Sequence, residues 1–326
     1  MEKKDLSIVY MGTPDFAVES LSRLVEEGYH IAGVITMPDK PAGRGHKLQA
    51  SPVKQYALEH HLPLLQPERL KDETFLAQLR SWHADLQIVV AFRMLPEVVW
   101  NMPPMGTFNL HASLLPDYRG AAPINWAVIN GETQTGVTTF FLQHEIDTGA
   151  ILRQERIAIA DTDNAGIVHD KLMRLGARLV TQTVDDILGG HVHPIAQEQM
   201  AVNGTLHTAP KLFKESCRIH WHQPAKHVYN FIRGLAPYPA AWTTLQLPSG
   251  EPLTLKIFEA EVLPYPTEDP SRPAPGTLLT DHKSYLRMAA EDGYLDIRSL
   301  QLPGKKRLAT DELLRGFRFA DAKIVG

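Results

Sequence analysis

The sequence predicts an α/β fold in which an open, mostly parallel sheet is followed by a small β-barrel. Residues 6–36 have the pattern strand, turn, amphipathic helix, strand, and two more apolar runs follow at 86–92 and at the end of GTFNLH. Beyond residue 240 the chain breaks into short alternating runs with turn residues between them. Strands alternating with helices are typical of a parallel sheet, whereas short alternating runs are typical of a barrel.

The first predicted unit is a βαβ unit. Residues 8–10 are apolar enough for a buried strand, Gly12 permits a sharp turn, and Pro14 stands where a helix begins. Gly28 ends that helix. The turn lacks the second and third glycines of the G-x-G-x-x-G pattern, and Pro14 lacks a backbone donor for a pyrophosphate. We therefore expect an open Rossmann-like sheet that does not bind a dinucleotide.

The predicted domain organisation has three parts. Residues 1–189 contain the βαβ pattern, and residues 190–210 are rich in Gly, His, Pro and Ala without sustained periodicity, as in a linker. Residues 211–326 contain the alternating runs and predict a small OB-like β-barrel. Their sequences are AAWTTLQL, PLTLKIFEAEVL, TLLTDH, SYLRMAA and GYLDIRSLQL.

The charge is unevenly distributed along the chain. The 326 residues carry a formal net charge of -4, yet residues 211–326 hold 16 Lys and Arg against 13 Asp and Glu. This favours an anionic partner for the second domain, although random unevenness would produce the same difference. A single cysteine, Cys217, excludes an internal disulfide, and the short apolar run after MEKKD is too short to span a membrane. We expect a cytoplasmic protein with no membrane partner.

The stretch FNLHASLLPDYRGAAP, residues 108–123, places polar residues at the end of an apolar run. Because side chains alternate along a strand, Thr107, Asn109 and His111 share one face. Ligands collect at the carboxyl ends of parallel strands, where Asn109 and His111 stand. An Asn amide and a His that carries a proton suit an oxyanion-and-acid site for acyl transfer. The alternative is that loop backbone satisfies both side chains.

A carboxylate follows the next apolar strand. Glu145 and Asp147 both come after GVTTFFLQ, and Asp147-Thr148-Gly149 is a turn in which a carboxylate can face inward. Near His111, that carboxylate would favour the imidazolium and orient the ring. In the alternative, Asp147 forms an Asx-turn and binds only its own backbone.

Other catalytic chemistries fit the sequence less well. Ser113 is not in a G-x-S-x-G elbow, so a serine hydrolase is not expected. No metal site is expected either, because three histidine pairs have neither cysteine partners nor an H-E-x-x-H helix. These pairs are His60/His61, His191/His193 and His220/His222.

The spacing of these motifs resembles that of the formyltetrahydrofolate-dependent formyltransferases. Asn109-x-His111 continues into Ser-Leu-Leu-Pro and Arg-Gly-Ala-Ala-Pro, and Asp147-Thr148-Gly149 follows downstream. The resemblance implies that Asn109, His111 and Asp147 act together on a formyl group. It also implies a folate-binding surface made by Ser113, Leu114, Leu115 and Pro116.

Within that family, the chain resembles the members that formylate methionyl initiator tRNA. MGTPDFA, PDKPAGRGHKL, SPVKQYA, LPLLQP, RGAAPI, TGVT, APG and LQLPGKKRL occur in the expected order. The resemblance implies a formyltransferase catalytic domain at 1–189 and a tRNA-binding barrel at 211–326. It also implies 10-formyltetrahydrofolate as formyl donor, no metal, and a monomer that supports translation initiation. The alternatives are a formyltransferase for a small amine and a non-catalytic folate- or RNA-binding protein.

One loop departs from the family pattern. Phe92-Arg93 stands before Met94-Leu95-Pro96 where the family usually has a Tyr-Gly pair. The resemblance implies that Phe92, Arg93, Met94 and Leu95 line the folate pocket. Contacts through backbone atoms are compatible with this change, whereas contacts that need a glycine-sized gap are not.

Two cationic segments are candidates for tRNA binding. The loop MPDKPAGRGHKL carries Lys40, Arg44 and Lys47, and the barrel carries Lys305, Lys306 and Arg307. Arg can fork to a base edge and Lys can contact phosphates, so both segments suit RNA. The alternative for the first segment is a solvated loop with no partner.

Overall fold

The computed structural model describes residues 2–42, 47–200, 204–266, 272–319 and 323–324. Its contacts divide the chain into two compact units. The first contains Met1–Gly120, Gln134–Ala158 and His169–Thr208, and the second contains Ala121–Thr133, Ile159–Val168 and Ala209–Gly326. The second unit thus takes in two segments that lie before residue 211.

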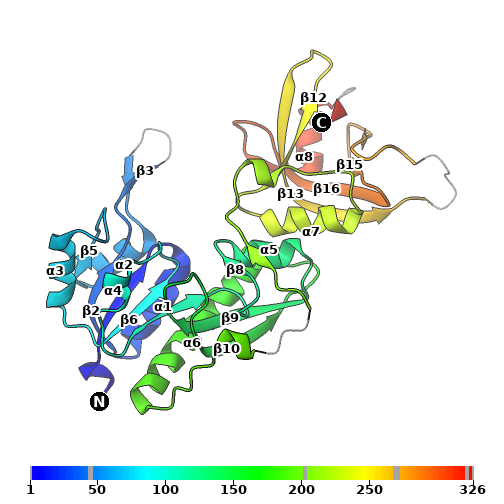
Figure 1. The fold of residues 1–326 in the computed structure, drawn as a ribbon. Helices are drawn as coiled ribbons and strands as arrows, with labels where there is room; N and C mark the ends of the chain where they lie inside the picture. The colour runs from blue at the N-terminus through cyan, green and yellow to red at the C-terminus, as the bar shows by residue number, and fades with distance from the viewer. Residues whose placement is uncertain (1, 43–46, 201–203, 267–271, 320–322, 325–326) are drawn as a thin grey trace. The chain divides into compact units, whose positions relative to one another are not determined.

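The first unit is built on a mixed, mostly parallel sheet, which confirms the predicted fold class (Figure 1). Its strands, in spatial order, are β10 (Ile151–Ala158), β9 (Gln134–Phe141), β7 (Thr107–His111), β6 (Leu86–Val90), β1 (Ser7–Gly12), β2 (His30–Ile35) and β5 (Leu64–Leu65). The five from β7 to β5 are parallel, β9 pairs antiparallel with β7, and β10 pairs antiparallel with β9.

Helices α1 (Asp15–Glu26), α2 (Pro52–Glu59), α3 (Glu73–Ser81) and α4 (Glu97–Trp100) connect strands of this sheet, and α6 (Ala165–Gly189) follows β10. Helix α1 begins directly after Pro14, and Gly28 after its end has a φ of 82°, as the sequence predicts. The side chains of Ser51 and Asp72 accept hydrogen bonds from the first turns of α2 and α3. A short 3-10 turn, η1 (Lys3–Asp5), precedes β1.

Strand β7 lies in the middle of this sheet. It pairs with β6 on one side and β9 on the other, and Asn109 lies opposite Val89 and Phe140. Phe108 and Leu110 are buried on the opposite face. The two polar residues near the end of β7 are therefore held by strands on both sides.

Residues 40–49 contain a short hairpin rather than the loop that the sequence suggests. Strand β3 (Lys40–Ala42) pairs antiparallel with β4 (Lys47–Gln49), and Figure 1 shows the hairpin extending from the first unit. Its base is anchored where Lys54 Nζ donates to Asp39 at 2.6 Å and Gln66 donates to the same carboxylate at 2.8 Å.

The second unit is an antiparallel half-barrel, as the alternating runs predict. Its sheet follows the order β14 (Leu278–Thr280), β15 (Leu286–Ala289), β16 (Gly293–Gln301), β13 (Pro252–Pro264), β12 (Ala241–Gln246) and β18 (Lys323–Ile324), and β17 (Arg307–Ala309) pairs with β16. Helix α7 (Ala225–Leu235), which the alternating runs do not predict, packs on β13 and on α5 (Pro123–Ile129). Helix α8 (Thr310–Leu314) follows β17, and the turn η3 (Glu215–Cys217) precedes α7.

The segment predicted as a linker carries local structure of its own. It contains the 3-10 turn η2 (Gln197–Gln199), and Ile195 bridges to Ile151 of β10. Strand β11 (Thr208–Ala209) pairs with β8 (Arg119–Gly120) at its end. Among the helices in the described ranges, none has the length and apolar character needed to cross a membrane.

Candidate active site

Asn109 and His111 come from the carboxyl end of β7, as predicted. They are two residues apart on one face of the strand, so their Cα atoms are about 6.6 Å apart. The side-chain oxygen Oδ1 of Asn109 is buried and has no hydrogen-bond partner among the described residues. A buried polar atom without a partner is costly, so this oxygen is available to accept a hydrogen bond from a ligand.

His111 is held in one orientation by its own loop. Only 7% of the residue is exposed, and its Nε2 lies 2.9 Å from the carbonyl oxygen of Tyr118. A carbonyl oxygen can only accept, so Nε2 carries a hydrogen in this contact. The other ring nitrogen, Nδ1, is therefore the atom that can gain or release a proton, and it faces the Asp147 carboxylate at 3.9 Å.

The structure distinguishes between the two carboxylates suggested by the sequence. Glu145 is exposed, whereas the side chain of Asp147 is 11% exposed and faces His111. Its Oδ2 accepts a hydrogen bond from the backbone N–H of Gly120 at 3.0 Å, so the carboxylate is bound by a distant loop and not by its own turn. His111 and Asp147 thus meet from two different segments of the chain, and Asn109 lies two residues before His111 on the same face of β7.

The turn that presents Asp147 is tight. Asp147 has a φ of 56°, in the left-handed region that few residues other than glycine adopt. At Gly149, an added Cβ would lie 1.7 Å from the carbonyl oxygen of Phe141, so only glycine fits there. The Asp-Thr-Gly sequence is therefore required by the path of the backbone as well as by the carboxylate.

The Ser-Leu-Leu-Pro stretch turns most of its side chains inward. Ser113 Oγ donates to the carbonyl oxygen of Asp117 at 2.6 Å, and Leu115 packs against Phe140 and Ile151. Pro116 is buried and Leu114 is half-buried. The Ser113 carbonyl oxygen also accepts from the Thr138 hydroxyl at 2.7 Å, so both the hydroxyl and the carbonyl of this fully buried residue are engaged inside the protein.

The structure gives a physical account of Phe92-Arg93. Arg93 donates to the carbonyl oxygen of Glu68 at 2.8 Å and also to that of Pro67, which ties the segment after β6 to the segment after β5. Burial lowers the pKa of the Arg93 guanidinium. Leu95 is buried in the core, Phe92 is half-buried against that core, and Met94 is 74% exposed. The arginine thus fixes a loop that a glycine would leave free to move.

Those predicted tRNA-binding residues whose side chains are described are exposed, unlike the groups above. Lys40 is exposed on β3; Arg44 lies outside the described residues, and only the backbone of Lys47 is described. In the second unit, Lys305 and Lys306 are exposed in the turn between β16 and β17.

Arg307, on the strand that follows this turn, is engaged by its neighbours. Its Nη2 lies 2.5 Å from Glu259 Oε1, Nε donates to Ser299 Oγ at 2.7 Å, and the guanidinium lies over the ring of Phe258. Arg307 is therefore held against the barrel while the two lysines extend into solvent.

Sequence reasoning missed three contributors to the site. Tyr118 and Gly120 act through backbone atoms, which leave no trace in residue type. Gln197 is 2% exposed, and its amide donates to the carbonyl oxygens of Asp147 and Gly149. A lone Gln in a segment without periodicity gave no signal.

Two family models match the chain. The model described as formyl transferase matches residues 6–184, and the model described as formyl transferase, C-terminal domain, matches residues 211–318. The chain is 70% identical over 322 residues to a protein named methionyl-tRNA formyltransferase from Bacteroides fragilis, covering 99% of this chain and 98% of the relative. It is 63% identical to the protein of that name from Parabacteroides distasonis, over the whole of both chains.

Solved structures share the fold at low identity. The chain superposes with a TM-score of 0.60 and 19% identity on an N-formyltransferase from Helicobacter canadensis, covering 90% of this chain and 98% of the other. It also superposes with a TM-score of 0.61 and 19% identity on HypX from Aquifex aeolicus in complex with tetrahydrofolic acid, covering 94% of this chain. The chain spans only 46% of that HypX chain, so this likeness concerns the fold alone.

Proposed function

The chain belongs to the methionyl-tRNA formyltransferase family, and on this basis we propose that it carries out formyl transfer through Asn109, His111 and Asp147. Its reaction is the formylation of methionyl-tRNA, which supports translation initiation. We propose 10-formyltetrahydrofolate as the formyl donor, the α-amino group of methionyl initiator tRNA as the acceptor, and no metal. We also expect a cytoplasmic monomer.

The observation that carries the catalytic assignment is the orientation of His111. Tyr118 binds Nε2, and Nδ1 faces Asp147 Oδ2 at 3.9 Å without a direct hydrogen bond. The buried Asn109 oxygen lies on the same strand face without a partner. Acyl transfer needs a positioned proton donor and a polar group that can stabilise the oxyanion, and His111 with its nearby carboxylate and Asn109 can supply them.

The chemistry follows from these groups. The α-amino nitrogen attacks the formyl carbon, a C–N bond forms, and negative charge develops on the formyl oxygen. The Asn109 amide N–H and the protonated Nδ1 of His111 can both donate to that oxygen, and one such donor contributes about 10²–10³ in rate. Because this amine is itself a nucleophile, the protein supplies no covalent intermediate.

The second half of the reaction needs a proton transfer. The bond between the formyl carbon and the folate nitrogen breaks, and that nitrogen gains a proton from His111. The attacking amine loses one proton to solvent water, and solvent then restores the proton of His111. General acid catalysis of this kind contributes about 10²–10⁴ in rate. Asp147 stabilises the charged imidazole through space, and accepting the proton of the amine through a water is its lesser alternative role.

The cationic residues support a separate role in tRNA binding. Lys40 and Lys47 belong to strands β3 and β4, Arg44 lies outside the described residues, and Lys305, Lys306 and Arg307 belong to the turn and strand after β16. Exposed cations attract phosphates without sequence preference, whereas a forked guanidinium can read a base edge. We propose that Arg44 contributes to the choice of tRNA and that the lysines contribute to affinity.

The catalytic assignment is tested with His111→Ala. We expect turnover to fall by about 10²–10⁴ because the general acid is lost, while equilibrium binding of tetrahydrofolate stays within about twofold. His144→Ala is the matched control, since that histidine is exposed and lies outside the cluster. Charged initiator tRNA and free amino-sugar nucleotides are offered side by side. Near-normal turnover by His111→Ala would contradict the assignment, and a preference for the free amines would contradict the acceptor.

A further inference from the structure

The segment before β11 carries a buried amide that no part of the proposed chemistry uses. Gln197 is the first residue of η2, and it is 2% exposed in a segment whose neighbours Glu198 and Gln199 are exposed. A buried glutamine must find partners for two N–H groups and two oxygen lone pairs.

Gln197 uses its whole hydrogen-bonding capacity on two parts of the active site. Its Nε2 donates to the carbonyl oxygen of Asp147 at 2.8 Å and to that of Gly149 at 2.9 Å. Its Oε1 accepts from Arg119 Nη2 at 2.6 Å and from Arg119 Nε at 3.1 Å. One amide thus joins the turn of Asp147 to the loop that contains Arg119.

These two parts are the ones that orient the carboxylate. The Asp147 side chain is bound by the N–H of Gly120, the residue after Arg119. Gln197 therefore binds the backbone of Asp147, whose carboxylate accepts that hydrogen bond, and the side chain of Arg119, which precedes the donor Gly120. Asp147 is also in the left-handed region, and such a conformation persists only where surrounding contacts enforce it.

No direct hydrogen bond fixes the distance between His111 and Asp147. His111 Nδ1 and Asp147 Oδ2 are 3.9 Å apart, too far for a hydrogen bond, so their separation is set by the backbone of each residue. His111 is fixed by β7 and by Tyr118. Asp147 is on a connection between strands, where Gln197 and Gly120 supply the hydrogen bonds to its carbonyl and carboxylate.

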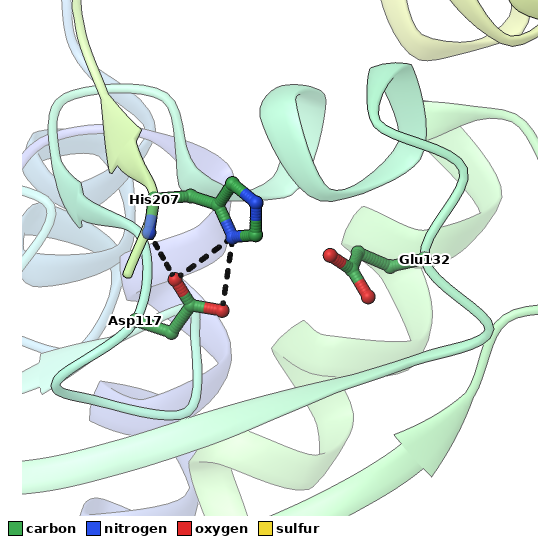
Figure 2. Close-up of side chains that lie close together, drawn as sticks. All are labelled: Asp117, Glu132 and His207. Atoms are coloured by element: carbon green, nitrogen blue, oxygen red, sulfur yellow. Dashed lines mark hydrogen bonds and ion pairs between the residues drawn. The ribbon is translucent and has the colours of Figure 1, made fainter. Parts of the chain in front are cut away.

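His207, from the same segment, contacts the loop that holds His111. The backbone N–H of His207 donates to Asp117 Oδ1 at 2.7 Å, and Figure 2 shows the two residues joined. The ring of His207 stacks on Tyr118 with centroids 5.1 Å apart, and the N–H of Tyr118 donates to the carbonyl oxygen of His207. Tyr118 is the residue that binds His111.

We propose that Gln197 is a positioning residue for formyl transfer, which sets the placement of the Asp147 carboxylate relative to His111. This inference rests on the proposed function, because it assigns Gln197 a role through Asp147. Gln197 itself touches no reacting atom. Segment 190–210 then has a part in catalysis in addition to joining the two halves of the chain.

The first test compares Gln197→Ala with Gln199→Ala, an exposed position on the same turn. Misplacing a catalytic group by about 1 Å can cost about 10²-fold in rate. We expect kcat of Gln197→Ala to fall by about 10- to 100-fold, with the KM for each substrate within about threefold, and Gln199→Ala to match the parent protein. Unchanged kcat in Gln197→Ala, or a loss equal to the fraction of unfolded protein, would overturn the proposal.

Gln197→Glu adds a readout that a merely structural role would not change. An ionised Glu can still accept from Arg119 but cannot donate to the carbonyl oxygens of Asp147 and Gly149, whereas a protonated Glu can donate once. We expect the ratio of its kcat to that of the parent protein to rise as the pH falls from 8 to 5. A ratio that does not change with pH would count against the positioning role.

His111→Ala in the same assays separates the two hypotheses. If His111→Ala is inactive and Gln197→Ala is normal, the proposed function stands and the positioning role is wrong. If His111→Ala retains turnover, the catalytic assignment fails and the inference built on it fails too.

Discussion

His111 and Lys40 both belong to groups proposed to meet a substrate, and the protein holds them in opposite ways. His111 is 7% exposed, pinned by Tyr118 and faced by Asp147. Lys40 is exposed on a short hairpin whose hydrogen bonds to the rest of the first unit are made at its base. The proposed catalytic residues are thus held by buried contacts, whereas Lys40, Lys305 and Lys306 present exposed charge.

This difference reflects two physical requirements. Stabilising charge at one atom needs donors that are already in place, because reorganising them during the reaction would cost free energy. Attracting a polyanion needs accessible charge, and a salt-dependent field acts over about 10 Å at ordinary ionic strength. The comparison therefore predicts that the two regions respond differently to mutation and to salt.

After His111→Ala, the largest effect is expected at Asn109. Asn109→Ala removes one of the two proposed donors to the developing oxyanion, so kcat should fall by about 10²–10³, while the KM for tRNA changes little. Steady-state kinetics with both substrates provide the measurement. Asn101→Ala is the control, since Asn101 is exposed before β7. A change confined to KM would show that Asn109 contributes to binding rather than to the transition state.

A smaller effect is expected from salt. Raising the salt from 50 to 200 mM should weaken tRNA binding by about tenfold or more, because several phosphate contacts release counterions. Folate affinity should change by less than about twofold, since all of the proposed pocket residues except Arg93 are uncharged. Fluorescence titration of each ligand at both salt concentrations checks this. Equal losses of affinity for tRNA and for folate would contradict the assignment of tRNA binding to the cationic segments.

The smallest effect is expected at the base of the hairpin. Asp39→Asn weakens the contact with Lys54 and keeps the size of the side chain, so the KM for tRNA should rise by about two- to fivefold at constant kcat. Glu59→Gln on the exposed end of α2 is the control. A fall in kcat without a change in KM would mean that the hairpin base acts on the catalytic cluster.

The same contact should be insensitive to pH in the physiological range. Hydrogen bonds from Lys54 and then from Gln66 lower the pKa of Asp39 below its usual value of 3.8. A depressed pKa means that the contact is present above the ordinary pKa and is lost only as the pH falls through the lower one. The effect of Asp39→Asn on the KM should therefore be constant between pH 5 and 8.

The sequence was most informative where pattern and burial agree. The alternating face of Thr107, Asn109 and His111, the turn at Gly28 and the antiparallel runs of the second unit all follow from periodicity and residue type. The strand pattern alone did not separate Glu145 from Asp147, because both follow the same strand, and it was the family resemblance that singled out Asp147. Only the fold brings the N–H of Gly120 to one of them.

Other parts of the site leave weak signals in a single sequence. Arg93 looked like a disturbance of a ligand loop, but its guanidinium binds two backbone carbonyl groups. Gln197 stands in a stretch whose composition suggests a flexible connection, and its partners are at least 48 positions away in the chain. Contacts of this range depend on tertiary structure, which periodicity does not report.

The bond between Tyr118 and the imidazole has a consequence for the order of events. Nε2 of His111 donates to the Tyr118 carbonyl oxygen, which can only accept. Any proton that His111 gains or releases is therefore carried by Nδ1. In the proposed mechanism, Nδ1 first stabilises the oxyanion, then gives up its hydrogen to the departing folate nitrogen, and is reprotonated before another turnover. Because a single nitrogen takes part, the loss of its proton to the folate nitrogen and its reprotonation must take place in succession and cannot coincide.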